Sequence, residues 1–467
     1  MSVTANFTGS GNTTRQFYSA YFVLDITNPE QEPKLLWSFS TSDLGMTTSY
    51  PTVVRVKPSG GSKTDNSNAK WFVVFGSGPN GYDGRALQKA KMWAVNLATG
   101  PTSGNVVSFN ANSANSSQKE FFGDLISMDR DLDYRADVVY GGSVIDDGSA
   151  PWRGKMYRLT TGDVSVSPTP VAFGLSTDPT KWGKLQEPTE VIDTFVLDGG
   201  TPVTKETGPI VAAPTVTLDD ANKVWVFFGT GRYYSATDKT DTSTQYFFGI
   251  KDSVLSYDCT QSSATSCLDN DLVNVSSATI CTTCAANGNV TGVTATVGAG
   301  SVTVTDFDNS SSNTSLVQLV KTKDGWVTAM PDSRERVLAA PALLGGVVFF
   351  PSFTPVNDIC VGIGTSQLYG LFYKTGTAHK DPILGVTTSA GNNYANRRVS
   401  MGEGMMSQAA IHIGAQGTGS SGTSSGTGCQ GRVSVIMQSS MGALSGRCTT
   451  PVNPVYSRYI SWVNNRD

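Results

Sequence analysis

The chain has few charged residues and almost no histidine. Only 15% of its 467 residues are Asp, Glu, Lys or Arg, and its two histidines are His379 and His412. Neither a serine nor a cysteine lies in a recognisable nucleophile motif, so a catalytic triad would be hard to assemble. The net charge of −4 and the lack of a basic run give no electrostatic footprint for nucleic acid. We therefore expect neither an enzyme nor a nucleic-acid-binding protein.

The sequence also lacks a hydrophobic run long enough to cross a bilayer. The longest apolar stretch, residues 337–350, is interrupted by Pro341 and by Gly345-Gly346. Residues 1–6 have neither the basic start nor the apolar stretch of a secretory signal. We expect that a signal was removed or that the chain is a shortened one, and we do not infer a cytoplasmic protein from this absence.

Glycine, serine and threonine are abundant, which is typical of strands joined by tight turns. A strand–turn–strand pattern over residues 17–39 is followed by an order of three strands that recurs along the chain. The expected strands are 51–56, 71–78 and 91–97; 125–128, 136–142 and 154–159; 213–218, 223–231 and 245–250; 339–344, 347–350 and 367–373; and a weaker 408–413 and 432–437.

Small antiparallel sheets repeated along a chain are typical of propeller blades, because each sheet needs a neighbour to bury its apolar face. The sequence predicts an all-β fold, a modified β-propeller that is incomplete within this chain and forms a single domain over residues 1–467. Residues 252–323, which contain cysteines, and the Gly/Ser/Thr-rich residues 414–429 are expected to be long insertions in rim loops.

Aromatic residues lie at matching positions in the repeats. We expect them to pack in the core, since a role in sugar binding or adhesion would require them to be exposed. These residues are Trp71, Trp93, Trp225, Tyr246, Phe349 and Tyr369.

Four acidic residues alternate with other residues in one short stretch. Asp129, Asp131, Asp133 and Asp137 stand at positions 1, 3, 5 and 9 of a loop, so a tight turn would direct these carboxylates at one centre. A hard cation needs six to eight oxygen ligands, and the main-chain carbonyl of Arg135 at position 7 would add another. The stretch predicts a calcium site with these five residues as ligands.

This loop is not an EF-hand, which places Gly at position 6 and Glu at position 12. Tyr134 and Tyr140 stand there, and the β-branched and aromatic residues 138–140 suit a loop between strands. The alternative is a solvated acidic turn neutralised by Arg130 and Arg135. We favour the metal site because four acids at this spacing repel one another without an ion.

A glycine-rich stretch, residues 76–81, formally fits a dinucleotide-binding pattern. Pro79 and the residues after it favour a turn over a helix start, and Gly229-Thr230-Gly231 occurs at the equivalent place in another repeat. We therefore expect both stretches to be turns within blades.

Seven cysteines leave at least one without a partner in the chain. Four of them lie in a segment with little apolar content, where a local disulfide staple is expected; zinc is the rival interpretation, although one pair is spaced too widely for a ribbon or finger. These four are Cys259, Cys267, Cys281 and Cys284. Cys429 and Cys448 would tie the base of residues 414–429.

Several stretches resemble the PilY/PilC-type proteins of the type IV pilus tip, in their C-terminal propeller domain. They are residues 21–29, 129–140, 226–234, the segment from 335–337 to 353–355, and 458–462. The resemblance implies a calcium-binding propeller that acts with minor pilins at the pilus tip, outside the bacterial cell after passage through the periplasm. It also implies a role in promoting pilus assembly, opposing retraction and supporting adhesion to a host or abiotic surface.

The resemblance carries the calcium ligands over to Asp129, Asp131, Asp133 and Asp137 by side chain and to Arg135 by main chain. The family has an earlier propeller segment and a large N-terminal region that this sequence does not show. We therefore expect a fragment, or one part of a split protein in which a separate chain supplies a missing blade.

Two other classes fit part of the pattern. A quinoprotein dehydrogenase is also a propeller with a calcium ion, but it uses a disulfide between adjacent cysteines, and no two cysteines are adjacent here. A secreted adhesive module unrelated to pili is the third interpretation.

Overall fold

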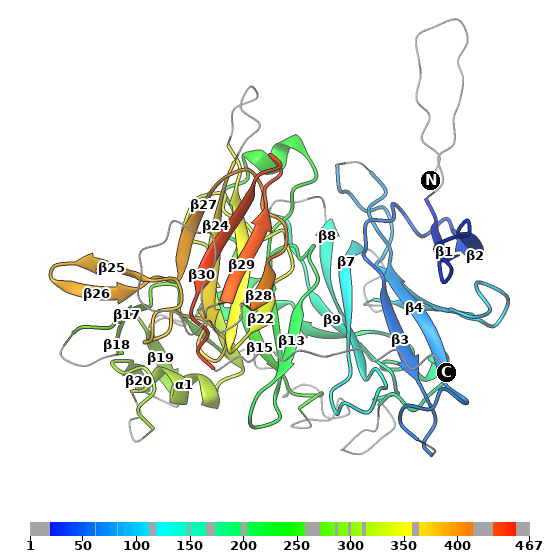
Figure 1. Cartoon of the computed structure of the whole chain (residues 1–467), viewed down its shortest axis with the longest axis horizontal. Coiled ribbons are helices and arrows are strands. Elements are labelled where there is room, and N and C mark those ends of the chain that lie inside the picture. The colour runs from blue at the N-terminus through cyan, green and yellow to red at the C-terminus, as the bar shows by residue number, and fades with distance from the viewer. Residues whose placement is uncertain are drawn as a thin grey trace, which may run out of the picture. The chain divides into compact units, whose positions relative to one another are not determined.

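The computed structural model describes residues 19–60, 62–81, 83–111, 118–146, 148, 151–164, 173–197, 203–256, 271–284, 288–297, 300–310, 314–356, 364–413 and 433–453 (Figure 1). The contacts within the chain divide it into two compact units. Unit 1 comprises residues 1–197, 202–272 and 336–338, and unit 2 comprises residues 198–201, 273–335 and 339–467. A single propeller domain over residues 1–467 stays a prediction.

Over its described residues, unit 1 consists of strands and two short 3-10 helices. Its elements are β1 (Tyr21–Asp25), β2 (Lys34–Phe39), β3 (Thr52–Val56), β4 (Lys70–Gly76), β5 (Lys91–Asn96), β6 (Val106–Asn110), β7 (Lys119–Met128), β8 (Val138–Asp146), β9 (Met156–Thr160), η1 (Pro179–Lys181), β10 (Thr189–Ile192), β11 (Thr194–Leu197), β12 (Val203–Glu206), β13 (Thr215–Leu218), β14 (Val224–Gly229), η2 (Ala236–Lys239) and β15 (Tyr246–Asp252).

The boundary between units 1 and 2 falls within strand β16 (Leu272–Asn274). The elements of unit 2 are β17 (Thr279–Cys281), β18 (Asn289–Thr291), β19 (Thr294–Val297), β20 (Gly300–Thr303), α1 (Leu316–Thr322), β21 (Gly325–Ala329), β22 (Ala342–Leu344), β23 (Val347–Thr354), β24 (Thr365–Phe372), β25 (Val386–Ser389), β26 (Asn392–Ala395), β27 (Arg398–Glu403), β28 (Ala410–Ile413), β29 (Val433–Gln438) and β30 (Leu444–Thr449). Among the described residues no helix has the length and apolar character needed to cross a bilayer.

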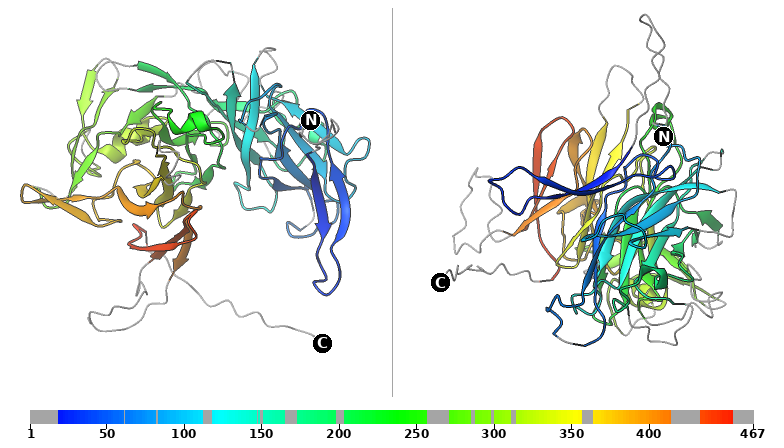
Figure 2. Two further views of the ribbon diagram at one scale, coloured as in Figure 1. Left: turned by 90° about the horizontal axis from the view of Figure 1, so that it is seen from above. Right: turned by 90° about the vertical axis from the view of Figure 1, so that its right-hand side faces the viewer.

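Two antiparallel four-stranded sheets pack face to face in unit 1. One has the order β3-β4-β5-β6 and the other β10-β9-β8-β7. A single apolar cluster joins them, with Val74 and Met92 from the first sheet and Phe122, Val139 and Tyr157 from the second, all at most 3% exposed. Figures 1 and 2 show the blue β3 and β4 beside the cyan β7 and β8. This is the blade-on-blade packing that the repeats predict.

Unit 2 contains a similar pair of sheets. The order β22-β23-β24-β27 packs against the three-stranded sheet β28-β29-β30. Phe349 and Leu368 from the first sheet meet Val435 and Met437 from the second in one buried cluster. The all-β prediction is therefore confirmed in both units.

The predicted order of three strands is also observed, but several sheets carry strands that the sequence analysis missed, three of them at the outer edge of a four-stranded sheet. These three strands are β6, β10 and β27. Strand β27, for example, reads Arg-Val-Ser-Met-Gly-Glu and has one buried residue, Met401. An outer strand covers only part of one face, so it lacks the apolar run by which the inner strands were recognised.

Glycine ends two of the strands because another segment approaches closely there. A Cβ atom at Gly76 would lie 2.4 Å from Cβ of Phe122, and one at Gly229 would lie 2.4 Å from Cβ of Val337. The residue after each glycine has a side-chain hydroxyl that accepts a hydrogen bond from a backbone N–H of the following strand. Ser77 accepts from Lys91 at 3.0 Å, and Thr230 accepts from Tyr246 at 2.8 Å. Both glycine-rich stretches are thus turns within sheets, as predicted.

The predicted insertion at 252–323 is structured over its described part, where it forms β16 to β20 and α1. A disulfide joins Cys281 and Cys284, which confirms a local staple for this pair and excludes zinc on these two thiols. Cys448 is also disulfide-bonded. Cys259, Cys267 and Cys429, and residues 414–429 as a whole, lie outside the described residues.

A buried glutamate is bonded to a serine and a tyrosine in each unit. In unit 1, Glu120 accepts hydrogen bonds from the hydroxyls of Ser143 and Tyr157. In unit 2, Glu335 accepts them from Ser352 and Tyr369, and Arg398 lies 3.3 Å from its carboxylate. The same arrangement on β8–β9 and β23–β24 supports the view that these sheets are repeats of one blade.

Burial raises the pKa of Glu120 from 4.5 to about 7, against the opposing effect of the Ser143 hydrogen bond. The folded protein therefore holds a proton that the unfolded chain releases between these two values. The contribution of Glu120 to the free energy of unfolding is fully present below pH 4.5 and is lost as the pH rises through about 7.

We expect Glu120→Gln to remove this pH dependence. Because glutamine stays neutral, the variant should exceed the parent protein in free energy of unfolding by about 3 kcal/mol above pH 8, with a smaller difference at pH 5. Urea denaturation across this range measures the effect, with the exposed Glu206→Gln as control. Parallel pH profiles for Glu120→Gln and the parent would contradict the prediction.

Candidate metal site

The acidic loop connects β7 and β8, which pair antiparallel along most of their length. Leu132 and Tyr134 have positive φ angles of 54° and 65°, so both adopt the left-handed backbone conformation that is common in tight turns. Their side chains are 78% and 60% exposed. Asp131 is exposed as well, so the alternation of all four acids around one centre stays a prediction.

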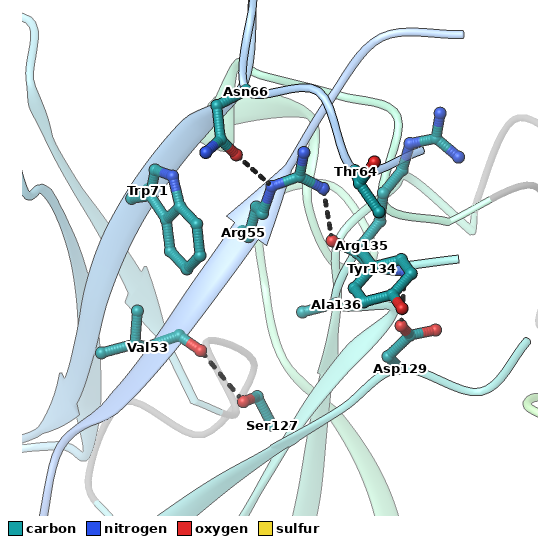
Figure 3. A pocket seen from close by; sticks show the side chains of 10 residues that line it. All are labelled: Val53, Arg55, Thr64, Asn66, Trp71, Ser127, Asp129, Tyr134, Arg135 and Ala136. Carbon is teal, nitrogen blue, oxygen red and sulfur yellow. Dashed lines mark hydrogen bonds between the residues drawn. The ribbon is translucent and has the colours of Figure 1, made fainter. Parts of the chain in front are cut away.

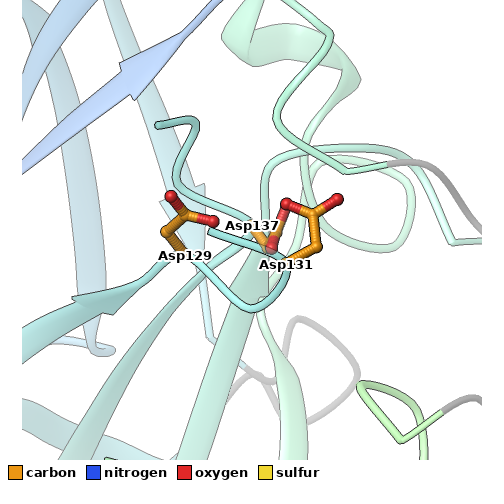
Figure 4. A group of neighbouring side chains, drawn as sticks. All are labelled: Asp129, Asp131 and Asp137. Atoms are coloured by element: carbon orange, nitrogen blue, oxygen red, sulfur yellow. The ribbon is translucent and has the colours of Figure 1, made fainter. Parts of the chain in front are cut away.

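Three carboxylates converge inside the loop. One oxygen each of Asp129, Asp131 and Asp137 lies within 4.8 Å of the others (Figure 4). Asp129 directly follows β7 and Asp137 directly precedes β8, while Asp131 comes from the turn between them. The cluster thus gathers oxygen ligands from both ends of the loop.

Backbone hydrogen bonds fix two of these acids. Asp129 accepts the N–H of Asp133 at 3.1 Å and that of Tyr134 at 2.7 Å. Asp137 accepts the N–H of Arg130 at 2.7 Å. The loop therefore keeps its fold while each carboxylate retains lone pairs for a further partner.

The fourth predicted acid has a different partner. Asp133 forms an ion pair with the guanidinium of Arg135 and also accepts the backbone N–H of Arg135 at 2.9 Å. It is not part of the cluster formed by Asp129, Asp131 and Asp137. The roles of Asp133 by side chain and Arg135 by main chain as metal ligands stay predictions.

Burial and mutual repulsion both act on the cluster. Burial raises the pKa of Asp137 to about 7, with smaller contributions from the charges of Asp131, Asp129 and Asp133. Burial also raises the pKa of Asp131, and the charges of Asp133 and Asp129 add to it. A cation among these oxygens would offset the repulsion, and an all-oxygen ligand set suits a hard ion such as Ca²⁺. The residues present therefore fit the predicted ion.

A pocket that the sequence analysis did not anticipate adjoins this loop within unit 1 (Figure 3). Its volume is about 550 Å³, and it is lined by Val53, Arg55, Thr64, Asn66, Trp71, Ser127, Asp129, Tyr134, Arg135 and Ala136. The prediction that Trp71 packs in the core is wrong, because its side chain is 41% exposed. The other five aromatic residues of that set are at most 8% exposed, as predicted.

The segment after β14, which contributed to the family resemblance, is structural. Arg232 is 1% exposed, and its Nε lies 3.2 Å from the carboxylate of Asp238. Its Nη2 donates to the carbonyl of Asp83 at 2.6 Å, and the guanidinium lies 3.5 Å from the ring centroid of Trp152. This arginine therefore joins separate loops of unit 1.

Comparison with known proteins gives one family of relatives. A type IV pilus biogenesis factor PilY1 homolog of Xylella fastidiosa is 24% identical over 421 residues, which are 84% of this chain and 23% of the relative. A second PilY1 homolog of the same organism is 25% identical over 235 residues, 50% of this chain and 15% of the relative. The chain thus spans about a quarter or less of the length of these relatives. No family model matches the chain.

Among solved structures, the C-terminal domain of Pseudomonas aeruginosa PilY1 matches with a TM-score of 0.56 and 18% identity, over 92% of this chain and 79% of that one. The sheets and this match define the fold as a modified β-propeller. More particularly, the sequence and fold similarities together support a PilY1-type C-terminal domain, which confirms the resemblance found in the sequence.

Proposed function

We propose that this chain is the calcium-binding domain of a type IV pilus biogenesis protein. The observation that carries the calcium part is the convergence of Asp129, Asp131 and Asp137 within 4.8 Å on a loop between two strands. The similarity to PilY1 homologs over 84% of the chain supports the pilus part.

In this proposal the cation connects the end of β7 to the start of β8. It replaces mutual repulsion of three carboxylates by attraction to a common charge, so that calcium occupancy sets the order of the loop. Extracellular calcium modules bind on the order of 10⁻⁴ to 10⁻³ M, which would let the site respond to ambient calcium.

The more specific role that we propose for this domain is the one that the family resemblance implies. The domain would act with minor pilins or pilin-like proteins at the pilus tip, outside the cell, where it promotes assembly, opposes retraction and supports adhesion. A separate polypeptide that supplies a missing blade is part of this proposal. Co-purification with pilins from a piliated bacterium tests the pilus part independently of calcium.

The calcium part is tested by titration calorimetry on chelator-stripped protein. We expect binding at one site, lost or weakened at least about tenfold in Asp131→Asn and Asp137→Asn, since each removes a negative ligand. The exposed Asp25→Asn, outside the loop, should bind like the parent protein. Absence of binding heat at millimolar calcium would leave residues 129–137 as an acidic turn.

The alternatives give different results in the same preparations. A quinoprotein dehydrogenase would show a quinone absorbance band, but the adjacent cysteines that such enzymes use do not occur in this sequence. A secreted adhesive module unrelated to pili would bind calcium without retaining pilins.

A further inference from the structure

The pocket that contains Trp71 has an apolar floor formed by two neighbouring strands. Trp71 on β4 lies directly opposite Arg55 on β3, and Val53 is two residues from Arg55, so all three share one face of the sheet. Trp71 and Val53 are 41% and 48% exposed. An indole ring therefore remains accessible in a hollow of about 550 Å³, a size typical of small-molecule sites.

Polar groups surround this floor on two sides (Figure 3). Thr64 and Asn66 come from the connection between β3 and β4, while Ser127 and Asp129 come from the end of β7 and the acidic loop. The Asn66 amide oxygen accepts the Nε–H of Arg55 at 3.3 Å, which leaves its NH₂ group directed elsewhere. Short hydroxyl, amide and carboxylate groups thus border a flat aromatic surface.

Arg55 fixes the floor and limits the charge of a ligand. It is 7% exposed, and its guanidinium donates to the carbonyls of Tyr134, Lys63 and Asp65 at 2.6, 3.3 and 2.9 Å. With these donors engaged, it cannot offer a bidentate fork to a carboxylate or phosphate. Its positive charge also disfavours a cationic ligand over Trp71.

A peptide added as a strand is disfavoured as well. The carbonyl of Val53 accepts the Ser127 hydroxyl at 3.1 Å, and the carbonyl of Arg55 accepts the N–H of Ala136 at 2.8 Å. The outer edge of β3 is therefore already bonded where the pocket lies, and strand addition needs a free edge.

We propose that this pocket binds a neutral saccharide, with a sugar ring stacked on Trp71. The C–H groups of a pyranose face carry partial positive charge and suit the negative face of an indole ring. The ring hydroxyls suit Asn66, Thr64 and Asp129 at the rim. The proposal does not depend on calcium binding, although Asp129 belongs to both sites.

The test uses maltotriose, chitotriose and an array of immobilised neutral and sialylated glycans, with the chain in calcium and in EDTA. We expect a neutral glycan to bind, to protect Trp71 from acrylamide quenching, and to lose at least about tenfold in affinity in Trp71→Ala. Trp71→Phe, which keeps an aromatic face, should retain part of the affinity. Tyr50→Ala, which removes a 72% exposed aromatic residue that does not line the pocket, should not change it.

Binding that is equal in Trp71→Ala and the parent protein would overturn the proposal, as would binding of sialylated glycans alone or of none on the array. Selection of a peptide from a displayed library at Trp71, without any glycan, would also overturn it. Saccharide binding by a protein that shows no calcium binding in the calorimetric titration would contradict the calcium proposal and support this one.

Discussion

Replacing Asp252 with alanine is expected to lower the free energy of unfolding by about 3–5 kcal/mol. Asp252 ends β15 and is fully buried, as is Arg158 on β9, whose Nη1 lies 3.0 Å from its carboxylate. The hydroxyl of Tyr140 on β8 donates to the same carboxylate at 2.8 Å. All three residues belong to unit 1, so the substitution leaves an arginine charge inside a packed core.

The geometry indicates that this charge would have little other compensation. Nε and Nη2 of Arg158 have no hydrogen-bond partner within the part of the chain that the structure describes. By contrast, Arg158→Met should cost less, because the remaining carboxylate still accepts the Tyr140 hydroxyl and the N–H of Val254 at 3.0 Å. The double variant Arg158→Met/Asp252→Asn should be more stable than Asp252→Ala, since no buried charge remains.

Urea denaturation followed by tryptophan fluorescence measures these differences. The control is the exposed ion pair between Arg153 and Glu206, whose atoms are 2.9 Å apart; Glu206→Ala should cost less than about 1 kcal/mol. A cost for Asp252→Ala no larger than that of this control would show that the buried pair does not stabilise the fold.

The inner strands could be predicted because their signal is local. Most contain a short apolar run, and in β4 and β14 that run is closed by glycine. The buried ion pair could not be predicted, because Arg158 and Asp252 are 94 residues apart in the sequence. Nothing in either segment indicates which sheet will cover the other.

At the candidate metal site, too, the features that are local in the sequence could be predicted and those that depend on the folded chain could not. The acids were recognised because the whole loop lies within nine positions of the sequence, from Asp129 to Asp137. The pairing of Asp133 with Arg135 depends on side-chain direction after the turn, which spacing alone does not determine. Trp71 lies on the face of β4 that carries Val73 and Phe75, which Trp37 and Phe39 of β2 cover; the extent of this cover is visible only in the folded chain.

Asp137→Asn is expected to change stability in opposite directions with and without calcium. In EDTA at about pH 8 the buried Asp137 carboxylate of the parent protein is ionised, because its raised pKa is about 7. The folded state has then lost the stability that the neutral carboxyl group contributes at lower pH. Asparagine stays neutral and can still accept the N–H of Arg130. The metal-free variant should therefore be more stable than the parent, by on the order of 2 kcal/mol.

Calcium should reverse this order. A ligand at a hundred times its dissociation constant stabilises the folded state by about 2.7 kcal/mol, and the variant would lose most of that gain. Thermal denaturation in EDTA and in millimolar calcium measures both differences on one sample. A variant that is less stable than the parent in EDTA would show that Asp137 is stabilised by its protein partners alone.

Asp133→Asn is the matched comparison, because it removes a charge from the same loop but breaks the ion pair with Arg135. It should lower stability in EDTA, where Asp137→Asn raises it. Stability changes of opposite sign for these two acids, four residues apart, would show that the protein itself stabilises the Asp133 carboxylate whereas the Asp137 carboxylate requires a cation. Stability changes of the same sign would mean that the loop responds only to its total charge. The cluster of Asp129, Asp131 and Asp137 would then have no distinct role in calcium binding.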